Sequence, residues 1–286
     1  MAPDRQKKKS LQLKLYFKEV YLFLITLLIS LIVGVFYIQA KSALPSTNMI
    51  VFPLWWLFIY FIVVTCLFVF LIKYVKNSGL FFRVIFIVVL FTGAQVFFSI
   101  FFNQIVSAIL AFILVCCRYY YPTIWLHDLA IIIGIGGLAG SWGVGFSVTS
   151  MIIILFVLSI YDYVAVYKTK HMVKMAQSMI KYQAIIAIII PEHVRDYLIN
   201  LNEFSPSKGG FMILGGGDLA LPSLFLVSVL SQYTIYHSLI VLFFILLGLF
   251  VMHYAFISQK NRKAMPALPP LAIFSIIGFI VSLLIL

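Results

Sequence analysis

Long apolar runs separated by short clusters of basic residues dominate this sequence. Several of the runs reach about 20 residues, the length that a helix needs to cross a hydrocarbon core of about 30 Å. The chain is 64% hydrophobic and only 10% charged, whereas a soluble domain carries about a quarter charged residues. The sequence therefore predicts an all-α protein that passes several times through the cell membrane.

The spacing of the basic clusters predicts where the helices turn. Residues 84–117 contain no charged residue and would be about 51 Å long as a single helix, which is too long for one span. We therefore expect the chain to turn back near Asn103. Equivalent turns are expected among the glycines of 140–145 and near Gln232.

This spacing gives nine transmembrane helices in one polytopic membrane domain, residues 1–286. Two helices joined by an outer loop at 41–48 come first, and one apolar segment remains at the C-terminal end. The predicted order is helices one to six in 1–167, a cytoplasmic loop in 168–209 and helices seven to nine in 210–286.

The arrangement places 19 of the 20 Lys and Arg residues on one side of the membrane and only Lys41 on the other. The positive-inside rule then puts the N-terminus in the cytoplasm and the C-terminus outside. The net charge of +12 does not indicate a nucleic-acid partner, because the basic residues lie between apolar segments and form no basic face interleaved with aromatic residues.

Two aspartates lie deep in apolar segments. Asp218 follows three consecutive glycines, 215–217, and Asp162 lies in the sixth predicted helix. A carboxylate in such a position costs roughly 2.5–3.5 kcal/mol, so it needs a partner or a cavity. Counted along helices from Lys168 and Lys208, the two acids lie about 9 and 15 Å from the cytoplasmic charges. They should therefore meet between two antiparallel neighbouring helices in the cytoplasmic half of the membrane.

Two carboxyl groups at close range share one proton and titrate as a unit. Such a pair can hold a water molecule, take its proton as it attacks a carbonyl, and protonate the developing oxyanion. The same position also suits an ion or proton site in a secondary transporter or cation channel, or a hydrogen-bonded pair in a scaffold. A transporter should show interrupted helices in two repeated halves, and the first half has no counterpart of the glycine run.

Three short motifs occur in order on the sixth, seventh and ninth predicted helices: Tyr161-Asp162, Gly215-x-Gly217-Asp218 and Pro266-Ala267-Leu268. Together they resemble the presenilin and signal peptide peptidase family, the GxGD-type intramembrane aspartyl proteases with nine transmembrane helices. The resemblance covers the whole chain. It implies that Asp162 and Asp218 are the catalytic pair. It also implies that the substrate cleft is lined by Tyr161, Gly215, Gly216, Gly217, Pro266, Ala267 and Leu268.

Two features make the chain similar to the presenilin branch of that family: its predicted orientation in the membrane and the proline that follows Leu268. The resemblance implies a compact prokaryotic-type homologue that cleaves transmembrane proteins or peptides in the lipid bilayer without accessory subunits, cofactor or metal, and it leaves a homo-oligomer open. The variable position of the GxGD motif is Gly216 rather than a larger apolar residue. We expect this glycine to loosen the cleft.

Glycines and prolines also predict local backbone structure. The glycine run frees backbone groups that could bind an extended substrate. Pro266, Pro269 and Pro270 keep their neighbours out of the α region, so this segment should be extended and the last helix should begin near Pro270. Residues 134–139 match a dinucleotide-binding motif only weakly, and the six glycines in 134–145 predict close helix packing instead.

His127 and Asp128 raise the alternative of a serine protease with Ser141 as the nucleophile. Ser141 lies about 20 Å further along the same helix, so we expect His127 and Asp128 to form an interfacial cap. His253 is expected to be a packed or hydrogen-bonded histidine.

The polar region 168–209 contains one apolar segment, 184–190, which is too short to span. It is predicted to be an interfacial amphipathic segment, or a plug or flap over the site.

Overall fold

The computed structural model describes residues 2–43, 78–169, 184–201, 203, 210–259 and 265–286. These residues form mainly helices. The α-helices are α1 (Ala2–Ala43), α3 (Ser78–Phe98), α4 (Gln104–Tyr120), α5 (Ile124–Gly143), α6 (Val148–Val164), α8 (Gly216–Gln232), α9 (Ile235–Ile257) and α10 (Leu268–Ile285). Five of the described helices are long and apolar enough to cross a membrane. The second predicted helix and much of the 168–209 loop lie outside the described residues.

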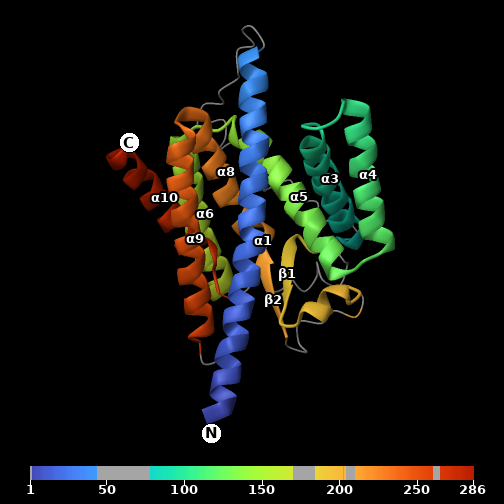
Figure 1. The fold of residues 1–286 in the computed structure, drawn as a ribbon, viewed down its shortest axis with the longest axis vertical. Coiled ribbons are helices and arrows are strands. Elements are labelled where there is room, and N and C mark those ends of the chain that lie inside the picture. The colour runs from blue at the N-terminus through green and yellow to red at the C-terminus, as the bar shows by residue number, and fades with distance from the viewer. Residues whose placement is uncertain (1, 44–77, 170–183, 202, 204–209, 260–264) are drawn as a thin grey trace.

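Helix α1 passes through the middle of the bundle (Figure 1) and contacts α5, α8 and α9. Its buried side chains include Phe23, Leu27 and Leu31, whose spacing of four residues places them on one helix face. Helices α3 and α4 lie on one side of α5, and α6, α9 and α10 lie on the other side of the molecule (Figure 1). The N-terminus and the C-terminus lie at opposite ends of the bundle.

The predicted turns are confirmed. Helix α4 begins directly after Asn103, whose side chain accepts a hydrogen bond from the Val106 N–H and caps the helix. Helix α5 ends at Gly143, and α6 begins after Ser147, which caps it in the same way. The chain turns again between Gln232 and α9. At the first two of these turns, the side chains of Asn103 and Ser147 satisfy backbone N–H groups that have no partner within the helix.

The glycines of α5 pack closely against neighbouring helices, as the sequence predicts. A Cβ added at Gly137 would lie 2.0 Å from the backbone oxygen of Gly93 in α3. A Cβ added at Gly140 would lie 2.4 Å from Val33 of α1. These glycines let backbones approach to distances that any side chain would prevent, and they fix α5 between α1 and α3.

A two-stranded antiparallel sheet corrects the expectation of an all-α fold. Strands β1 (Ala187–Pro191) and β2 (Phe211–Gly215) pair with Ala187 opposite Gly215 and Pro191 opposite Phe211. All five residues of β1 are buried, so the expectation of an interfacial amphipathic segment at 184–190 is wrong. Its run of isoleucines is β-branched and favours a strand.

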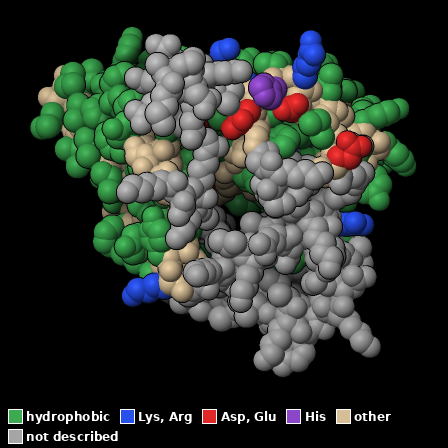
Figure 2. Space-filling view, turned by 90° about the horizontal axis from the view of Figure 1, so that it is seen from below, with side chains coloured by type: hydrophobic (Ala, Val, Ile, Leu, Met, Phe, Trp, Pro, Cys, Tyr) green, Lys and Arg blue, Asp and Glu red, His purple; other side chains and the backbone are tan. Residues whose placement is uncertain are grey.

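The sheet lies at the same end of the bundle as the N-terminus (Figure 1). A π-helical turn (Ala165–Thr169) continues α6, and a 3₁₀-helix (Val194–Leu198) follows β1. Figure 2 shows this end of the molecule, where acidic, basic and histidine side chains lie among mostly hydrophobic side chains of the described residues. Because β2 takes the place of the first part of the seventh predicted helix, the helical depth estimate for Asp218 is wrong.

Candidate active site

Asp218 is the third residue of α8, at the point where strand β2 becomes a helix. Gly215 is the N-cap, with φ −61° and ψ 142°. The backbone N–H of Gly215 faces the Asp218 carboxyl, and a Cβ added at Gly215 would lie 2.9 Å from Asp218 Oδ2. An acidic side chain at the third helical position that reaches back to the N-cap N–H is half of a capping box. The position of Asp218 is therefore set by its own segment.

Asp162 lies near the end of α6 and reaches the beginning of α10. Its Oδ2 accepts a hydrogen bond from the backbone N–H of Leu268 at 3.2 Å, and the Ala267 N–H interacts with the same carboxyl. Leu268 is the first residue of α10, and the next two residues are Pro269 and Pro270, which have no N–H. Asp162 therefore satisfies the first backbone donor of α10 from a different helix.

The structure brings the two aspartates together. Asp162 and Asp218 are 7% and 8% exposed, and their carboxyls are close enough to interact electrostatically. The Asp218 carboxyl lies at the beginning of α8 and the Asp162 carboxyl reaches the beginning of α10, where backbone N–H groups and the helix dipole favour negative charge. Two buried carboxyls in such a position can bind a water molecule and exchange a proton.

The three glycines before Asp218 have different surroundings. A Cβ added at Gly216 would lie 2.7 Å from Ile186 Cγ2 and 2.9 Å from the Ile186 backbone oxygen, and 3.2 Å from Ile135 of α5. A Cβ added at Gly217 would meet no atom of the described residues within 4 Å. The expectation that Gly216 loosens the cleft is therefore wrong, because β1 and α5 already fill the space beside it. The open space lies at Gly217.

The segment 265–267 leads into α10 without regular secondary structure, but it is not extended throughout as expected, because the backbone of Ala267 lies in the right-handed helical region. Pro266, Ala267 and Leu268 are buried, and Ala267 adopts φ −91° and ψ −28°. Helix α10 begins at Leu268, two residues before the expected Pro270, because prolines are tolerated in the first turn of a helix. The segment thereby places two backbone N–H groups against Asp162.

Tyr161, the remaining residue predicted for the cleft, lies on the outer side of α6. Its side chain is 61% exposed, whereas the adjacent Asp162 points inward. Neighbouring residues of a helix point in directions about 100° apart. The tyrosine is therefore open to a molecule that approaches α6 from outside.

His127 and Asp128 do not form an interfacial cap, which corrects that prediction. Their side chains are 0% and 2% exposed, and Thr123 is the N-cap of α5. Asp128 accepts a hydrogen bond from the backbone N–H of Ile189 at 2.9 Å, and His127 bonds to the backbone oxygen of Ala187 at 2.9 Å. Both residues bind β1, which the sequence did not reveal because the strand itself was not predicted.

A second buried polar pair joins α1 to α9. His253 Nδ1 lies 2.5 Å from Glu19 Oε2, which confirms that His253 is hydrogen-bonded. Glu19 is fully buried, and its pairing with His253 is not evident from the sequence. The ring of Tyr16, also in α1, lies 5.0 Å from the His253 ring.

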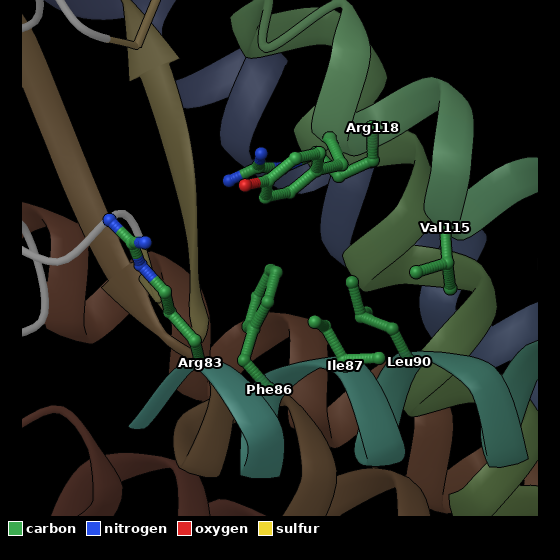
Figure 3. A pocket seen from close by; sticks show the side chains of 7 residues that line it. Arg83, Phe86, Ile87, Leu90, Val115 and Arg118 are labelled. Atoms are coloured by element: carbon green, nitrogen blue, oxygen red, sulfur yellow. The ribbon is translucent and has the colours of Figure 1, made fainter. Parts of the chain in front are cut away.

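A pocket between α3 and α4 is separate from the aspartates. Figure 3 shows its lining, which includes Arg83, Phe86 and Leu90 from α3 and Val115 and Arg118 from α4. Neither aspartate lines it.

The fold and the site together define a membrane protein of many helices with two buried, interacting aspartates at helix ends. The family model described as signal-peptide peptidase, presenilin aspartyl protease matches residues 20–286. The chain belongs to this family and is an intramembrane aspartyl protease. No curated protein sequence matches the chain.

Two solved structures of a presenilin family intramembrane aspartate protease are similar to this chain. The structure in the C222 space group has a TM-score of 0.62 at 20% identity, and the match covers 95% of this chain and 99% of that one. The structure in the P2 space group has a TM-score of 0.60 at 20% identity, with 93% and 96% covered. At this identity the likeness shows the fold, over nearly the whole chain.

Proposed function

We propose that this protein hydrolyses peptide bonds within transmembrane helices of membrane-protein substrates, and that Asp162 and Asp218 are its catalytic pair. The observation that carries the proposal is that the two carboxyls are both buried and close enough to interact electrostatically. Each of them is held by backbone N–H groups at the beginning of a helix. The family assignment favours this function over an ion or proton site in a transporter.

In the proposed reaction, the ionised carboxyl takes a proton from a bound water, and the water oxygen attacks the substrate carbonyl carbon. The neutral carboxyl gives its proton to the carbonyl oxygen, which forms a neutral diol. Proton transfer to the amide nitrogen then allows the C–N bond to break. The products are a new carboxyl end and a new amino end, and the pair returns to its starting state with one shared proton.

The pairing of β1 with β2 suggests where an extended substrate would bind. The N–H of Gly216 bonds to Ile186 O, and the N–H of Glu192 bonds to Gly210 O. Antiparallel pairing alternates, so the backbone groups of Ile213 and Gly215 point away from β1. A substrate strand added at this edge would pass the open space at Gly217, beside Asp218. Pro266, Ala267, Leu268 and Tyr161 are proposed to line the opposite side of this cleft.

We further propose nine membrane spans in the cell membrane, with the N-terminus in the cytoplasm and the C-terminus outside. The two ends lie at opposite ends of the bundle (Figure 1), as an odd number of spans requires. One of the nine spans falls outside the described residues. The active site would then lie toward the cytoplasmic side, and the protein would act in the bilayer without accessory subunits.

Purified protein in lipid vesicles, incubated with a transmembrane reporter peptide, tests the proposal. Mass spectrometry should find cleavage inside the apolar run of the peptide. A peptide that carries a hydroxyl in place of the scissile carbonyl should block the reaction, whereas the same peptide without the hydroxyl should not. Absence of cleavage, or cleavage that the hydroxyl peptide does not block, would contradict the proposal.

A further inference from the structure

Strand β1 has an outer edge that faces away from β2. Hydrogen bonds from Gly216 to Ile186 and from Glu192 to Gly210 lie just beyond the two ends of the sheet, and they set which residues of β1 bond to β2. Because the pairing alternates, the backbone groups of Ala187, Ile189 and Pro191 belong to the other edge. An edge of this kind, buried in a membrane protein, must find partners for its N–H and C=O groups.

Side chains from two helices supply those partners. The Ile189 N–H donates to Asp128 Oδ1 of α5 at 2.9 Å, and the Ala187 carbonyl lies 2.9 Å from His127 Nε2. At the far end, Lys18 Nζ of α1 donates to the Pro191 carbonyl at 2.7 Å, and the proline has no N–H to satisfy. Three successive positions on the outer edge are therefore bound by side chains rather than by another strand.

The His127 ring is held so that it can only donate to β1. Arg118 Nε donates to His127 Nδ1 at 2.9 Å, so the ring proton must be on Nε2, which donates to the Ala187 carbonyl. The Phe86 ring stacks on His127 at 6.0 Å with an interplanar angle of 15°, and the Arg118 guanidinium lies 5.3 Å from the Phe86 ring centre. Figure 3 shows Phe86 of α3 pointing toward Arg118 of α4.

Burial of the Asp128 carboxyl at this place costs free energy. It is 2% exposed, and its Oδ2 has no hydrogen-bond partner among the described residues. Tyr197 lies close by: burial, and then the charge of Asp128, raise the pKa of that phenol to about 12. A buried carboxyl with one oxygen unpaired destabilises the fold, whereas an amide at this position would also accept the Ile189 N–H.

We propose that His127 and Asp128 are positioning residues that hold β1 by its outer edge and thereby set the position of Gly215 and Asp218. The connection is short, because β1 pairs directly with β2 and the first N–H of α8 bonds to the carbonyl of Ile186, the residue before β1. The inference rests on the proposed catalytic role of Asp218. It also explains why an extended substrate would add to β2, since the outer edge of β1 is occupied.

Two independent measurements test this role. One is disulfide formation between Ile189→Cys and Ile213→Cys, which lie opposite each other in the sheet, in a background that lacks the three native cysteines. This measurement reports the strand register and does not depend on catalysis. The other is kcat and KM for the transmembrane reporter peptide, measured without the added cysteines.

Asp128→Ala should slow disulfide formation and lower kcat by about tenfold, with a smaller change in KM. Asp128→Asn keeps an oxygen that accepts the Ile189 N–H and should restore both measurements. Ser141→Ala serves as the control, because Ser141 lies on the same helix and bonds only to carbonyls of its own helix among the described contacts. If Asp128→Ala does not fold, Asp128→Ser replaces it, since its shorter side chain withdraws the oxygen from Ile189.

The proposal is overturned if Asp128→Ala forms the disulfide as fast as the parent, or if it loses the register and keeps its kcat. It is also overturned if Asp128→Asn is as damaged as Asp128→Ala. Failure of the proposed function gives a different result: Asp218→Asn would then cleave like the parent. The disulfide measurement would still decide whether Asp128 holds β1.

Discussion

Helices α8 and α10 both begin at the candidate site, and they obtain their carboxylates in different ways. Helix α8 carries Asp218 in its own first turn, three residues after its N-cap Gly215. Helix α10 has no acidic residue in its first turn, and its first N–H bonds to Asp162 of α6. One acid is therefore positioned by local sequence and the other by the packing of two helices. Changes at the start of α8 should act on one segment, whereas changes at the start of α10 should act through a contact between segments.

Among changes at the beginning of α8, the largest effect on stability and cleavage is expected at Gly216. Gly216→Ala places a Cβ 2.9 Å from the Ile186 backbone oxygen, which cannot move without shifting β1. Overpacking of this kind costs about 1–3 kcal/mol, so both the melting temperature and the cleavage rate should fall. Gly217→Ala is the matched control for the melting temperature, because its Cβ meets no atom of the described residues within 4 Å. Equal melting temperatures for the two variants would show that the start of α8 is not tightly packed.

A smaller effect is expected where α10 depends on Asp162. Replacing both Pro269 and Pro270 by alanine adds two backbone N–H groups to the first turn of α10, next to the one that bonds to Asp162. The added donors compete for the carboxyl, so kcat should fall by about tenfold or less. The melting temperature should change little. Steady-state kinetics of the purified variant test this, and an unchanged kcat would mean that Asp162 is not sensitive to the donors of α10.

The smallest effect is expected at Tyr161, beside Asp162 but on the exposed side of α6. Tyr161→Ala should leave the melting temperature unchanged, because the side chain is 61% exposed. If the tyrosine contacts the substrate as proposed, KM should rise a few-fold with little change in kcat. A rise of this size corresponds to the free energy of about one aromatic contact. Tyr161→Phe separates the ring from the hydroxyl. A loss of stability instead would show that Tyr161 supports the end of α6.

The contrast between the two helix starts also explains what the sequence could predict. The turns near Asn103, among the glycines of 140–145 and near Gln232 follow from polar residues or glycines between apolar runs, which act locally. The importance of Asp218 follows from a glycine run and an acid within one segment. These features need no knowledge of the rest of the fold.

Features that depend on distant segments were predicted less well. Strand β1 reads as a short apolar segment of uncertain type, and only its pairing with residues 211–215 makes it a strand. The burial of Asp128 follows from that strand, so an interfacial cap was the natural prediction for a polar pair at the beginning of a helix. Gly216 was expected to leave space, but Ile186 and Ile135 occupy it.

The most direct test is whether Asp162 and Asp218 act as one catalytic unit, although one is positioned by its own segment and the other by the packing of two helices. Cleavage of the reporter peptide is measured for Asp162→Asn, Asp218→Asn and the double variant, with melting temperature as the control for folding. Asn is nearly isosteric with Asp but cannot exchange a proton. Each single variant should therefore retain less than about 1% of the activity, and the double variant should lose no more than either single one. A folded single variant that keeps more than about 1% of the activity would contradict the assignment of the pair.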